Sequence, residues 1–429
     1  MRTSIWRGAL CALLPLAAGV ACRDVTTLEQ SNPGSLSAAT LYTPENAQIL
    51  VNGAIGDFEC AFSRYVAGSG LFTDELSDAI SNPTNFDFDR RTLATNGSYG
   101  TGTCGNNQQP PIYTTLSTAR ASNDTVLAKL RGWTDAEMPT GVNRTKLIGQ
   151  AAAYAGYSLV LLGEGMCTAA LNLGPELQPA DLFAQAKIRF DSAIVAASAA
   201  NDASTLNLAT LGRARTLLDL KDPANAEKDA VKIPPGFVVN MTTDVVNLRR
   251  ENFVFLQINQ NSFSTIEPSA RNLTIDGAPD PRVAVTNTGK SGSTAGTQVW
   301  TADKYPALGT PMPIARYAEA QLIVADARLA ANDLGGVAAA INTARATHAG
   351  LPLYSATGQS ADSVKAQLIE ERRRELFLEG HRLGDLRRYG IPLTPAAGAA
   401  YPGGGGTYGT QTCFPLPDVE RINNPSISK

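Results

Sequence analysis

The sequence predicts a mostly α-helical protein. Helical hairpins of the tetratricopeptide-repeat type form a scaffold, and long irregular loops with a few short strands make up the rest. Three observations lead to this prediction. Apolar residues recur at helical spacing, as at Leu182, Phe183, Ala186, Phe190 and Ile194. Two alanine-rich helix–turn–helix stretches resemble each other. Segments rich in Gly, Asn and Pro interrupt the helical pattern.

The helices can be placed along the chain by their caps and their apolar periodicity. The first is expected from Pro44 to about Arg64, because Thr43 is a good N-cap residue and proline suits the first helical position. Periodic apolar or alanine positions predict further helices over residues 112–131, 144–163, 180–199, 206–220, 223–231, 314–331, 334–346 and 362–379. Short strands are expected at 253–258 and 298–301.

The two similar stretches start at Leu208 and Ala318. Each has an alanine-rich helix, a short turn that contains Asp222 or Asp333, and a second helix with small residues. Small residues let paired helices approach closely, as in tetratricopeptide repeats. The match to the full repeat consensus is loose, so generic antiparallel hairpins remain the alternative.

The N-terminus has the pattern of a signal peptide at residues 1–21. Two arginines precede an apolar run over residues 9–21, which is too short to span a membrane. Cys22 follows small residues directly, which predicts a lipid-modified cysteine. Gly19 stands where such sites usually carry Leu. An ordinary secretory peptide, with Cys22 free or oxidised, is therefore the alternative.

The remainder of the chain is expected to be a tether followed by one domain. Residues 22–43 are polar and turn-rich, and residues 44–429 are expected to form a single domain. No apolar run beyond Cys22 is long enough to cross a membrane. Long irregular segments on a helical scaffold are the usual place for binding. We therefore expect ligand contacts in the loop-rich regions, 77–111, 232–310 and 392–412.

The composition argues against nucleic acid as a partner. The formal net charge is −3, and the one basic run, Arg372–Arg374, lies among glutamates. No metal or cofactor is expected, since the sequence has no Cys-x-x-Cys pair and only His348 and His381 as imidazole ligands. Nucleophile-elbow, HExxH and EF-hand motifs do not occur. We therefore expect binding and not enzyme activity.

Four cysteines remain once the signal peptide and the anchor are set aside. They are Cys60, Cys104, Cys167 and Cys413, an even number in a chain that is expected to be exported. Disulfides are the default expectation in that setting. Three connectivities exist, and we favour Cys60–Cys104 with Cys167–Cys413.

The C-terminal third carries an ordered set of motifs. The run from Ile369 to Arg382 contains Glu-Arg, Glu-Leu and Glu-Gly-x-Arg, and Asp-Leu-Arg with Tyr389 follows it. Asp-Pro-Arg at 280–282 and a helix pair around 314–345 lie upstream, and Phe-Pro-Leu-Pro at 414–417 lies downstream. In this order the motifs resemble the SusD/RagB family of outer-membrane nutrient-binding lipoproteins. Tyr389 departs from the pattern, because Trp is common there.

The resemblance implies a function. Family members are cell-surface, lipid-anchored proteins that capture oligosaccharides or other oligomeric nutrients. They deliver the ligand to a TonB-dependent β-barrel transporter (SusC-like) in the outer membrane. Two other functions remain as alternatives for this chain. One is a secreted glycan-active hydrolase, and the other is a helical-repeat scaffold for protein interactions.

The charged residues of the C-terminal motif are interpreted as structural. Glutamates and arginines stand three or four residues apart, so opposite charges are expected to pair along one helix face. Arginine neighbours keep a carboxylate ionised, which argues against a general acid of a hydrolase. The residues of this structural signature are Glu371, Arg372, Glu375, Glu379, Arg382 and Asp385.

Ligand-binding candidates are chosen as aromatic and amide side chains in the loop regions. Aromatic rings pack on the apolar faces of sugars, while amide groups hydrogen-bond to hydroxyls. The alternative is that these aromatic side chains pin the loops to the helices. The candidates are Asn85, Phe86, Phe88 and Tyr99, followed by Trp300 and Tyr305.

Overall fold

The computed structural model describes residues 37–105, 110–247, 249–402 and 405–427. The predicted signal peptide at 1–21, Cys22 and most of the predicted tether therefore lie outside the described residues. The end of the tether forms a short helix, α1 (Ala38–Leu41), which Ser37 caps. Among the described residues no helix is both long enough and apolar enough to cross a membrane.

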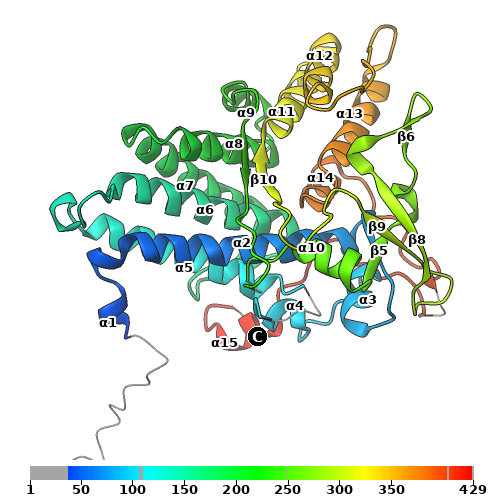
Figure 1. The fold of residues 1–429 in the computed structure, drawn as a ribbon. Helices are drawn as coiled ribbons and strands as arrows, with labels where there is room; N and C mark the ends of the chain where they lie inside the picture. The colour runs from blue at the N-terminus through cyan, green and yellow to red at the C-terminus, as the bar shows by residue number, and fades with distance from the viewer. Residues whose placement is uncertain (1–36, 106–109, 248, 403–404, 428–429) are drawn as a thin grey trace, which may run out of the picture.

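The scaffold is a row of antiparallel helices that starts from the long helix α2 (Ala47–Phe72) (Figure 1). Helices α5 (Tyr113–Gly132) and α6 (Arg144–Gly165) pack on α2 and on each other, and α7 (Pro179–Ala199) packs on α6. Then follow α8 (Ala203–Asp219), α9 (Pro223–Ala230), α11 (Tyr317–Ala330), α12 (Leu334–Arg345) and α13 (Ala361–Glu375). The mostly helical fold is thus confirmed.

Two helix ends differ from the prediction. Helix α2 continues to Phe72, eight residues beyond Arg64, because its second half is buried on nearly every side and packing holds it there. The predicted helix 362–379 ends at Glu375. Leu378 and Gly380 take positive φ values and turn the chain into α14 (Arg382–Tyr389).

Tight packing between α6 and α7 depends on glycine. A Cβ atom at Gly156 would lie 2.7 Å from the ring of Phe190, closer than real contacts allow. The ring of Phe190 also covers Gly212 on α8. The small residues in this region therefore let a bulky side chain of α7 fill the space between helices, as the hairpin prediction requires.

Within the described ranges the strands form five two-stranded antiparallel sheets. The pair β1 (Leu76–Asp78) and β5 (Ser264–Ile266) places Leu76 opposite Ile266, and β8 (Val285–Ser291) pairs with β9 (Gln298–Ala302). The smaller pairs are β4 (Val238–Asn240) with β10 (Pro313–Arg316), β2 (Ala169–Ala170) with β3 (Glu176–Leu177), and β6 (Thr274–Ile275) with β7 (Ala278–Pro279).

Two predicted segments need correction, one expected to be a loop and one expected to be a strand. Residues 77–111 are not a plain loop, since they contain α3 (Pro83–Asp89) and α4 (Ser98–Thr101). Residues 253–258 are not a strand. They form α10 (Phe253–Phe255) and a π-helical turn (Leu256–Gln260), because Asn252 caps the segment by accepting a hydrogen bond from the Phe255 N–H. The strand predicted at 298–301 is β9.

Both favoured disulfides are present in the structure. Cys60 on α2 is bonded to Cys104, which follows α4, and Cys167 after α6 is bonded to Cys413. The Cys413 segment lies against the end of α6, where the Phe414 N–H donates to the Gly165 carbonyl. Each disulfide therefore fastens an irregular segment to a scaffold helix. Near the C-terminus the described chain adds one short helix, α15 (Asp418–Asn423).

Candidate functional site

The charged residues of the C-terminal motif form a buried ion network. Glu375 accepts hydrogen bonds from Arg316, at 2.6 Å, and from His348, at 2.8 Å. Arg382 binds Asp74 through two hydrogen bonds of 2.6 and 2.7 Å. The expected pairing along one helix face is wrong for these residues, because their partners come from other elements. Short spacing is seen at Glu370, which pairs with Arg373 and Arg374, and at Asp385, which pairs with Arg388.

The other pairs of the network likewise join residues from different elements. Glu371 is paired with Arg282 and Arg345, Glu379 with Lys304 and Arg316, and Arg372 with Asp326 and Asp385. Each pair joins α13, or the segment just after it, to a different part of the chain. The network therefore ties the loop segments 280–282 and 304–316 to the helical scaffold.

The pKa values of these carboxyl groups fit a structural role. Burial by itself raises the pKa of Glu375, but the hydrogen bond from His348 and the charge of Arg316 lower it to about 2. The pKa of Glu371 is lowered in the same way, against burial, by hydrogen bonds and charge from Arg345 and Arg282. Carboxylates held ionised in this way cannot act as general acids near neutral pH.

Four of the predicted ligand-binding side chains are buried in this structure. Asn85 donates to Gln257, and Phe88 packs edge-on against Tyr99 and Phe414. The Tyr99 hydroxyl donates to the Pro415 carbonyl, and the Tyr305 hydroxyl donates to the Leu378 carbonyl. These residues pin loops to the scaffold, because burying a ring with its polar atom satisfied stabilises the loop more than exposing it would.

Trp300 on β9 is the best placed of the candidates. It is half-buried, and the guanidinium of Arg271 lies over its ring, 5.4 Å from the centroid. In the β8–β9 register Asn287 stands directly opposite Trp300, so both side chains project from one face, together with Gln298. Asn287 and Gln298 are exposed. We call these four residues the Trp300 face.

Phe86 on α3 is also half-buried, but it is already covered. The guanidinium of Arg90 lies 4.3 Å from its ring centroid, and Tyr401 meets its edge at 5.8 Å. Tyr401 belongs to the predicted binding region 392–412. Its hydroxyl donates to Asp89, and burial raises the pKa of Asp89 to about 7. This part of the region is therefore packed onto α3.

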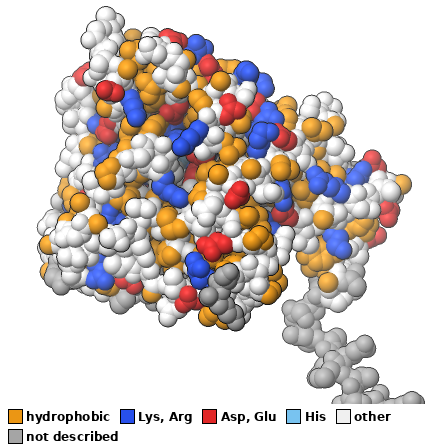
Figure 2. Space-filling view, turned by 180° about the vertical axis from the view of Figure 1, so that it is seen from behind, with side chains coloured by type: hydrophobic (Ala, Val, Ile, Leu, Met, Phe, Trp, Pro, Cys, Tyr) orange, Lys and Arg blue, Asp and Glu red, His pale blue; other side chains and the backbone are white. Residues whose placement is uncertain are grey.

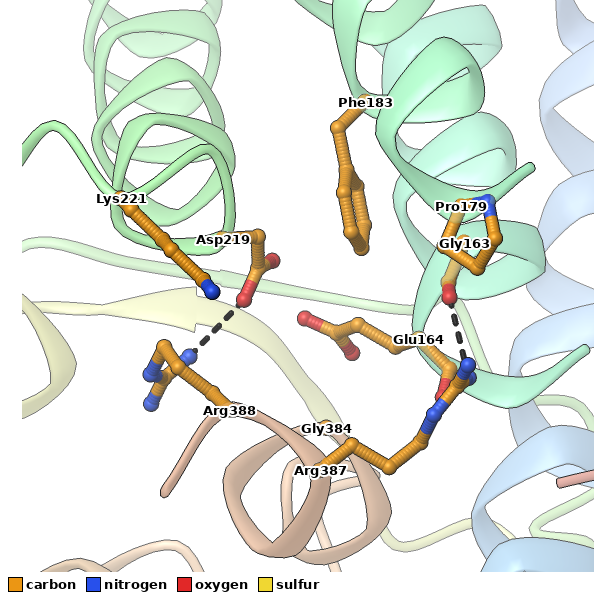
Figure 3. A pocket seen from close by; sticks show the side chains of 9 residues that line it. All are labelled: Gly163, Glu164, Pro179, Phe183, Asp219, Lys221, Gly384, Arg387 and Arg388. Atoms are coloured by element: carbon orange, nitrogen blue, oxygen red, sulfur yellow. Dashed lines mark hydrogen bonds and ion pairs between the residues drawn. The ribbon is translucent and has the colours of Figure 1, made fainter. Parts of the chain in front are cut away.

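A cavity of about 210 Å³ lies among Phe183, Glu164, Asp219 and residues of α14 (Figure 3). One Nη of Arg387 donates to the carbonyls of Gly163, Glu164 and Met166, which end helix α6. Arg388 donates to Asp219 at 3.0 Å. The sequence did not indicate this cavity. Its two arginines belong to the C-terminal motif, whereas its carboxylates, on Glu164 and Asp219, lie on helices that are far from the motif in sequence.

The surface has no large field of one charge on the face that Figure 2 shows. Lysine and arginine side chains alternate there with aspartate and glutamate among apolar patches. Among the described residues no group of three or more His, Cys, Asp or Glu side chains is placed to hold a metal ion. The arrangement offers hydrogen-bonding groups and a half-buried indole, which suit an uncharged polar ligand.

Comparison with known proteins places this fold in a defined class. The model of the SusD family matches residues 270–421. A SusD superfamily protein from Bacteroides vulgatus has a TM-score of 0.65 at 16% identity, over 88% of this chain and 97% of that chain. A SusD-like carbohydrate-binding protein from Bacteroides fragilis has a TM-score of 0.63 at 15% identity, over 90% of this chain and 100% of that chain.

A third solved structure contains a ligand. It is the surface glycan-binding protein A from Bacteroides thetaiotaomicron in complex with laminarihexaose, with a TM-score of 0.65 at 14% identity, over 89% of this chain and 98% of that chain. No curated protein sequence matches the chain. The described elements thus have the SusD-like helical fold. The SusD family model matches the C-terminal third of the same chain, over residues 270–421.

Proposed function

We propose that this protein binds oligosaccharides at the cell surface and delivers them to a TonB-dependent β-barrel transporter of the outer membrane. The carrying observation is the match to the SusD family, in a chain whose fold extends over nearly the whole length of glycan-binding relatives. The lipid on Cys22 would hold the protein on the membrane, and the predicted tether would give it reach.

The Trp300 face is proposed as the place where the sugar binds. An indole accepts the apolar face of a sugar ring, and the amides of Asn287 and Gln298 lie beside it for the hydroxyls. The guanidinium of Arg271 lies over the indole ring. It supports the ring from the face opposite the sugar, or it moves aside when the sugar binds. Phe86 is kept as a secondary contact, because Arg90 must move before the ring is free.

Catalysis is not part of the proposal, because no observation favours it. A glycoside hydrolase needs an accessible carboxyl group with a raised pKa opposite a second carboxylate. The carboxyl groups of Asp89 and Glu319 have pKa values raised to about 7 by burial, but both side chains are inside the protein. Burial also raises the pKa of Asp219, in the cavity of Figure 3, to about 7, but its side chain is 4% exposed and paired with Arg388, and the neighbouring Glu164 is paired with Arg215.

The anchor and the partner can be tested together in cells that make the protein. Wild type should sediment with membranes and recover a large β-barrel protein when it is captured with an affinity tag. The Cys22→Ser variant should appear in the soluble exported fraction, because one thiol carries the lipid. Membrane association that persists in Cys22→Ser without a captured barrel protein would remove the lipid anchor, and capture of wild type without any barrel protein would remove the transport part of the proposal.

A further inference from the structure

A groove of about 330 Å³ lies between the first half of α2 and the loop that connects β4 to α10. Asn52, Gly53 and Asp57 line it from the helix, and Asn247, Arg249 and Arg250 line it from the loop. Its volume is within the range of small-ligand sites. In Figure 1 the first half of α2 lies well away from β9, so this groove is separate from the Trp300 face.

The glycine at position 53 is the first observation that favours ligand binding in the groove, because it leaves the helix backbone bare there. It lies inside helix α2, where glycine is less favourable than any residue except proline. The other glycines of α2 that approach a neighbour have a packing reason; a Cβ atom at Gly56 would lie 3.2 Å from Arg250. At Gly53 a Cβ atom would meet nothing within 4 Å. Packing within the protein therefore does not explain this glycine, whereas a ligand on the bare backbone would.

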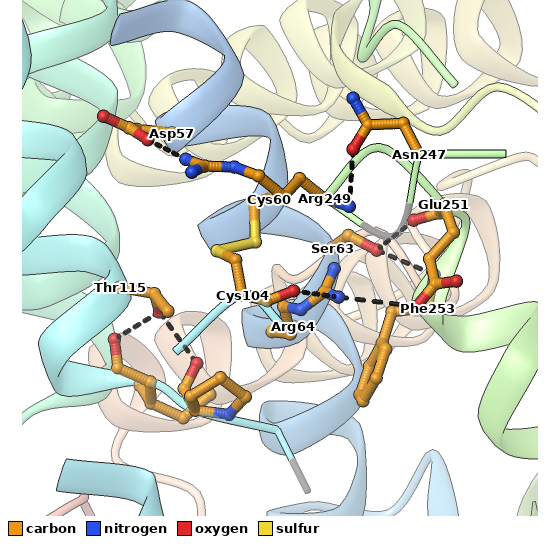
Figure 4. Close-up of a disulfide and its surroundings, with 12 residues drawn as sticks. Asp57, Cys60, Ser63, Arg64, Cys104, Thr115, Asn247, Arg249, Glu251 and Phe253 are labelled. Atoms are coloured by element: carbon orange, nitrogen blue, oxygen red, sulfur yellow. Dashed lines mark hydrogen bonds and ion pairs between the residues drawn. A yellow bond between two sulfur atoms is a disulfide. The ribbon is translucent and has the colours of Figure 1, made fainter. Parts of the chain in front are cut away.

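The charges of the groove are already paired. Arg249 forms an ion pair with Asp57 from across the groove (Figure 4). Arg250 lies 3.7 Å from the buried carboxylate of Glu59, whose other oxygen accepts a hydrogen bond from the Thr242 N–H. Because both cations have a carboxylate partner, the groove has no excess charge for an ionic ligand. It is suited to a neutral one.

The remaining lining groups offer amide hydrogen-bond donors, and exposed apolar residues lie close to them in sequence. The Oδ1 atoms of Asn52 and Asn247 accept hydrogen bonds from Gln48 and from the Arg249 N–H, while their Nδ2 atoms bond to none of the described residues. Ile49, one turn before Gly53, is 67% exposed, and Val246 is 86% exposed. Free amide donors beside exposed apolar side chains match the hydroxyls and the C–H face of a sugar ring.

We propose that this groove is a second saccharide subsite, which takes one or two neutral sugar units on the backbone of α2 at Gly53. The inference rests on the proposed function, because it assigns a second glycan-binding position to the same chain. An oligosaccharide bound in the groove contacts Asn52 and Asn247 through its hydroxyls and Ile49 through its ring face. Arg249 and Asp57 stay paired, and together they offer hydrogen-bonding groups to the sugar along one side of the groove.

The test is a calorimetric titration of the full-length protein in detergent with neutral hexasaccharides, laminarihexaose among them. Gly53→Leu fills the groove and favours the helix. Gly132→Leu is the matched control, since Gly132 is an exposed helical glycine with nothing within 4 Å of its Cβ position and lies outside the groove. Trp300→Ala removes the other proposed site. Thermal unfolding is recorded for each variant.

The inference expects two binding events per chain in wild type and in Gly132→Leu. Gly53→Leu should lose one event, or weaken it about tenfold or more, while its unfolding midpoint stays level or rises by about 1–3 °C. A wild-type isotherm from Gly53→Leu overturns the subsite and leaves the proposed function standing if Trp300→Ala weakens binding. Absence of heat with every hexasaccharide overturns both. Loss of the barrel partner in Gly53→Leu, with glycan binding intact, would make the groove a protein contact and also overturn the inference.

Discussion

Single residues of the ion network decide how firmly the loops are held. Glu375 is inaccessible to solvent and interacts with Arg316, His348 and Arg282. When a buried charge loses its partner, the remaining charges keep their desolvation cost without the compensating attraction. Removing such a residue therefore lowers the free energy of unfolding strongly, whereas removing one partner of an exposed pair changes it little.

Replacing Glu375 with Gln should lower the free energy of unfolding by about 3–5 kcal/mol, because the buried network loses the negative charge that faces both Arg316 and Arg282. Glu370→Gln on the same helix is the control. Its side chain is 34% exposed and pairs with Arg374 over four residues, so a loss below about 1 kcal/mol is expected. Urea unfolding measures both. Equal losses in the two variants would mean that the network is no more than a surface feature.

Asp89 should make the stability depend on pH. Burial raises its pKa to about 7 in the folded state, against about 3.9 in an unfolded chain. The folded protein therefore holds a proton that the unfolded chain releases. This stabilisation is complete below pH 4 and is lost as the pH rises through 7. In Asp89→Asn the slope of unfolding free energy against pH should become less negative by about 1.4 kcal/mol per pH unit between pH 5 and 6.5. Urea unfolding in that range measures it, and an unchanged slope would contradict the assignment.

At the scale of elements, the α6–α7 contact gives the sharpest prediction. Gly156→Ala should destabilise the protein by about 1–3 kcal/mol, because the added methyl group overlaps the Phe190 ring. Gly132→Ala, at an open helical position, should be neutral or slightly stabilising. Combining Gly156→Ala with Phe190→Leu should cost less than the sum of the two changes, since the smaller side chain relieves the overlap. Additive losses in unfolding free energy would place the glycine outside this contact.

The helices were predictable because long periodic segments carry their own signal. Helices α5 to α9 and α12 begin and end within a few residues of their predicted limits, and α11 is preceded by the short strand β10. Shorter segments were less predictable. The apolar run at Phe253 has the composition of a strand, and only the cap at Asn252 and the packing around it make it helical. Periodicity alone cannot separate these two outcomes over six residues.

The candidate site was predictable in residue type and not in exposure. Phe88, Tyr99 and Tyr305 are aromatic residues in loop regions, as a sugar platform would require, yet each is buried. A loop residue faces inward or outward according to the elements that cover it, and these come from distant parts of the chain. The partners of Glu375 and Arg382 also come from distant parts of the chain, up to about 300 residues away in sequence.

For the whole molecule, the helical scaffold, two disulfides and the ion network fix the positions of irregular segments that would otherwise be independent. Each disulfide ties a segment to a scaffold helix, and the network ties the segments that lead into and out of β8 and β9 to α13. A rigid support matters for binding, because a site held in place beforehand loses less entropy when the ligand arrives. The scaffold supports both the Trp300 face and the groove beside the first half of α2.

The central claim, that the molecule binds glycans through its loop-rich part, is tested most directly by titrating laminarihexaose and other neutral hexasaccharides into wild type, Trp300→Ala and Trp133→Ala. Trp133 is the control, since it is a half-buried tryptophan at the end of α5, in the helical scaffold. We expect binding in wild type and Trp133→Ala, and an affinity about tenfold or more lower in Trp300→Ala. Equal affinity in all three proteins, or no binding of any glycan, would contradict the account.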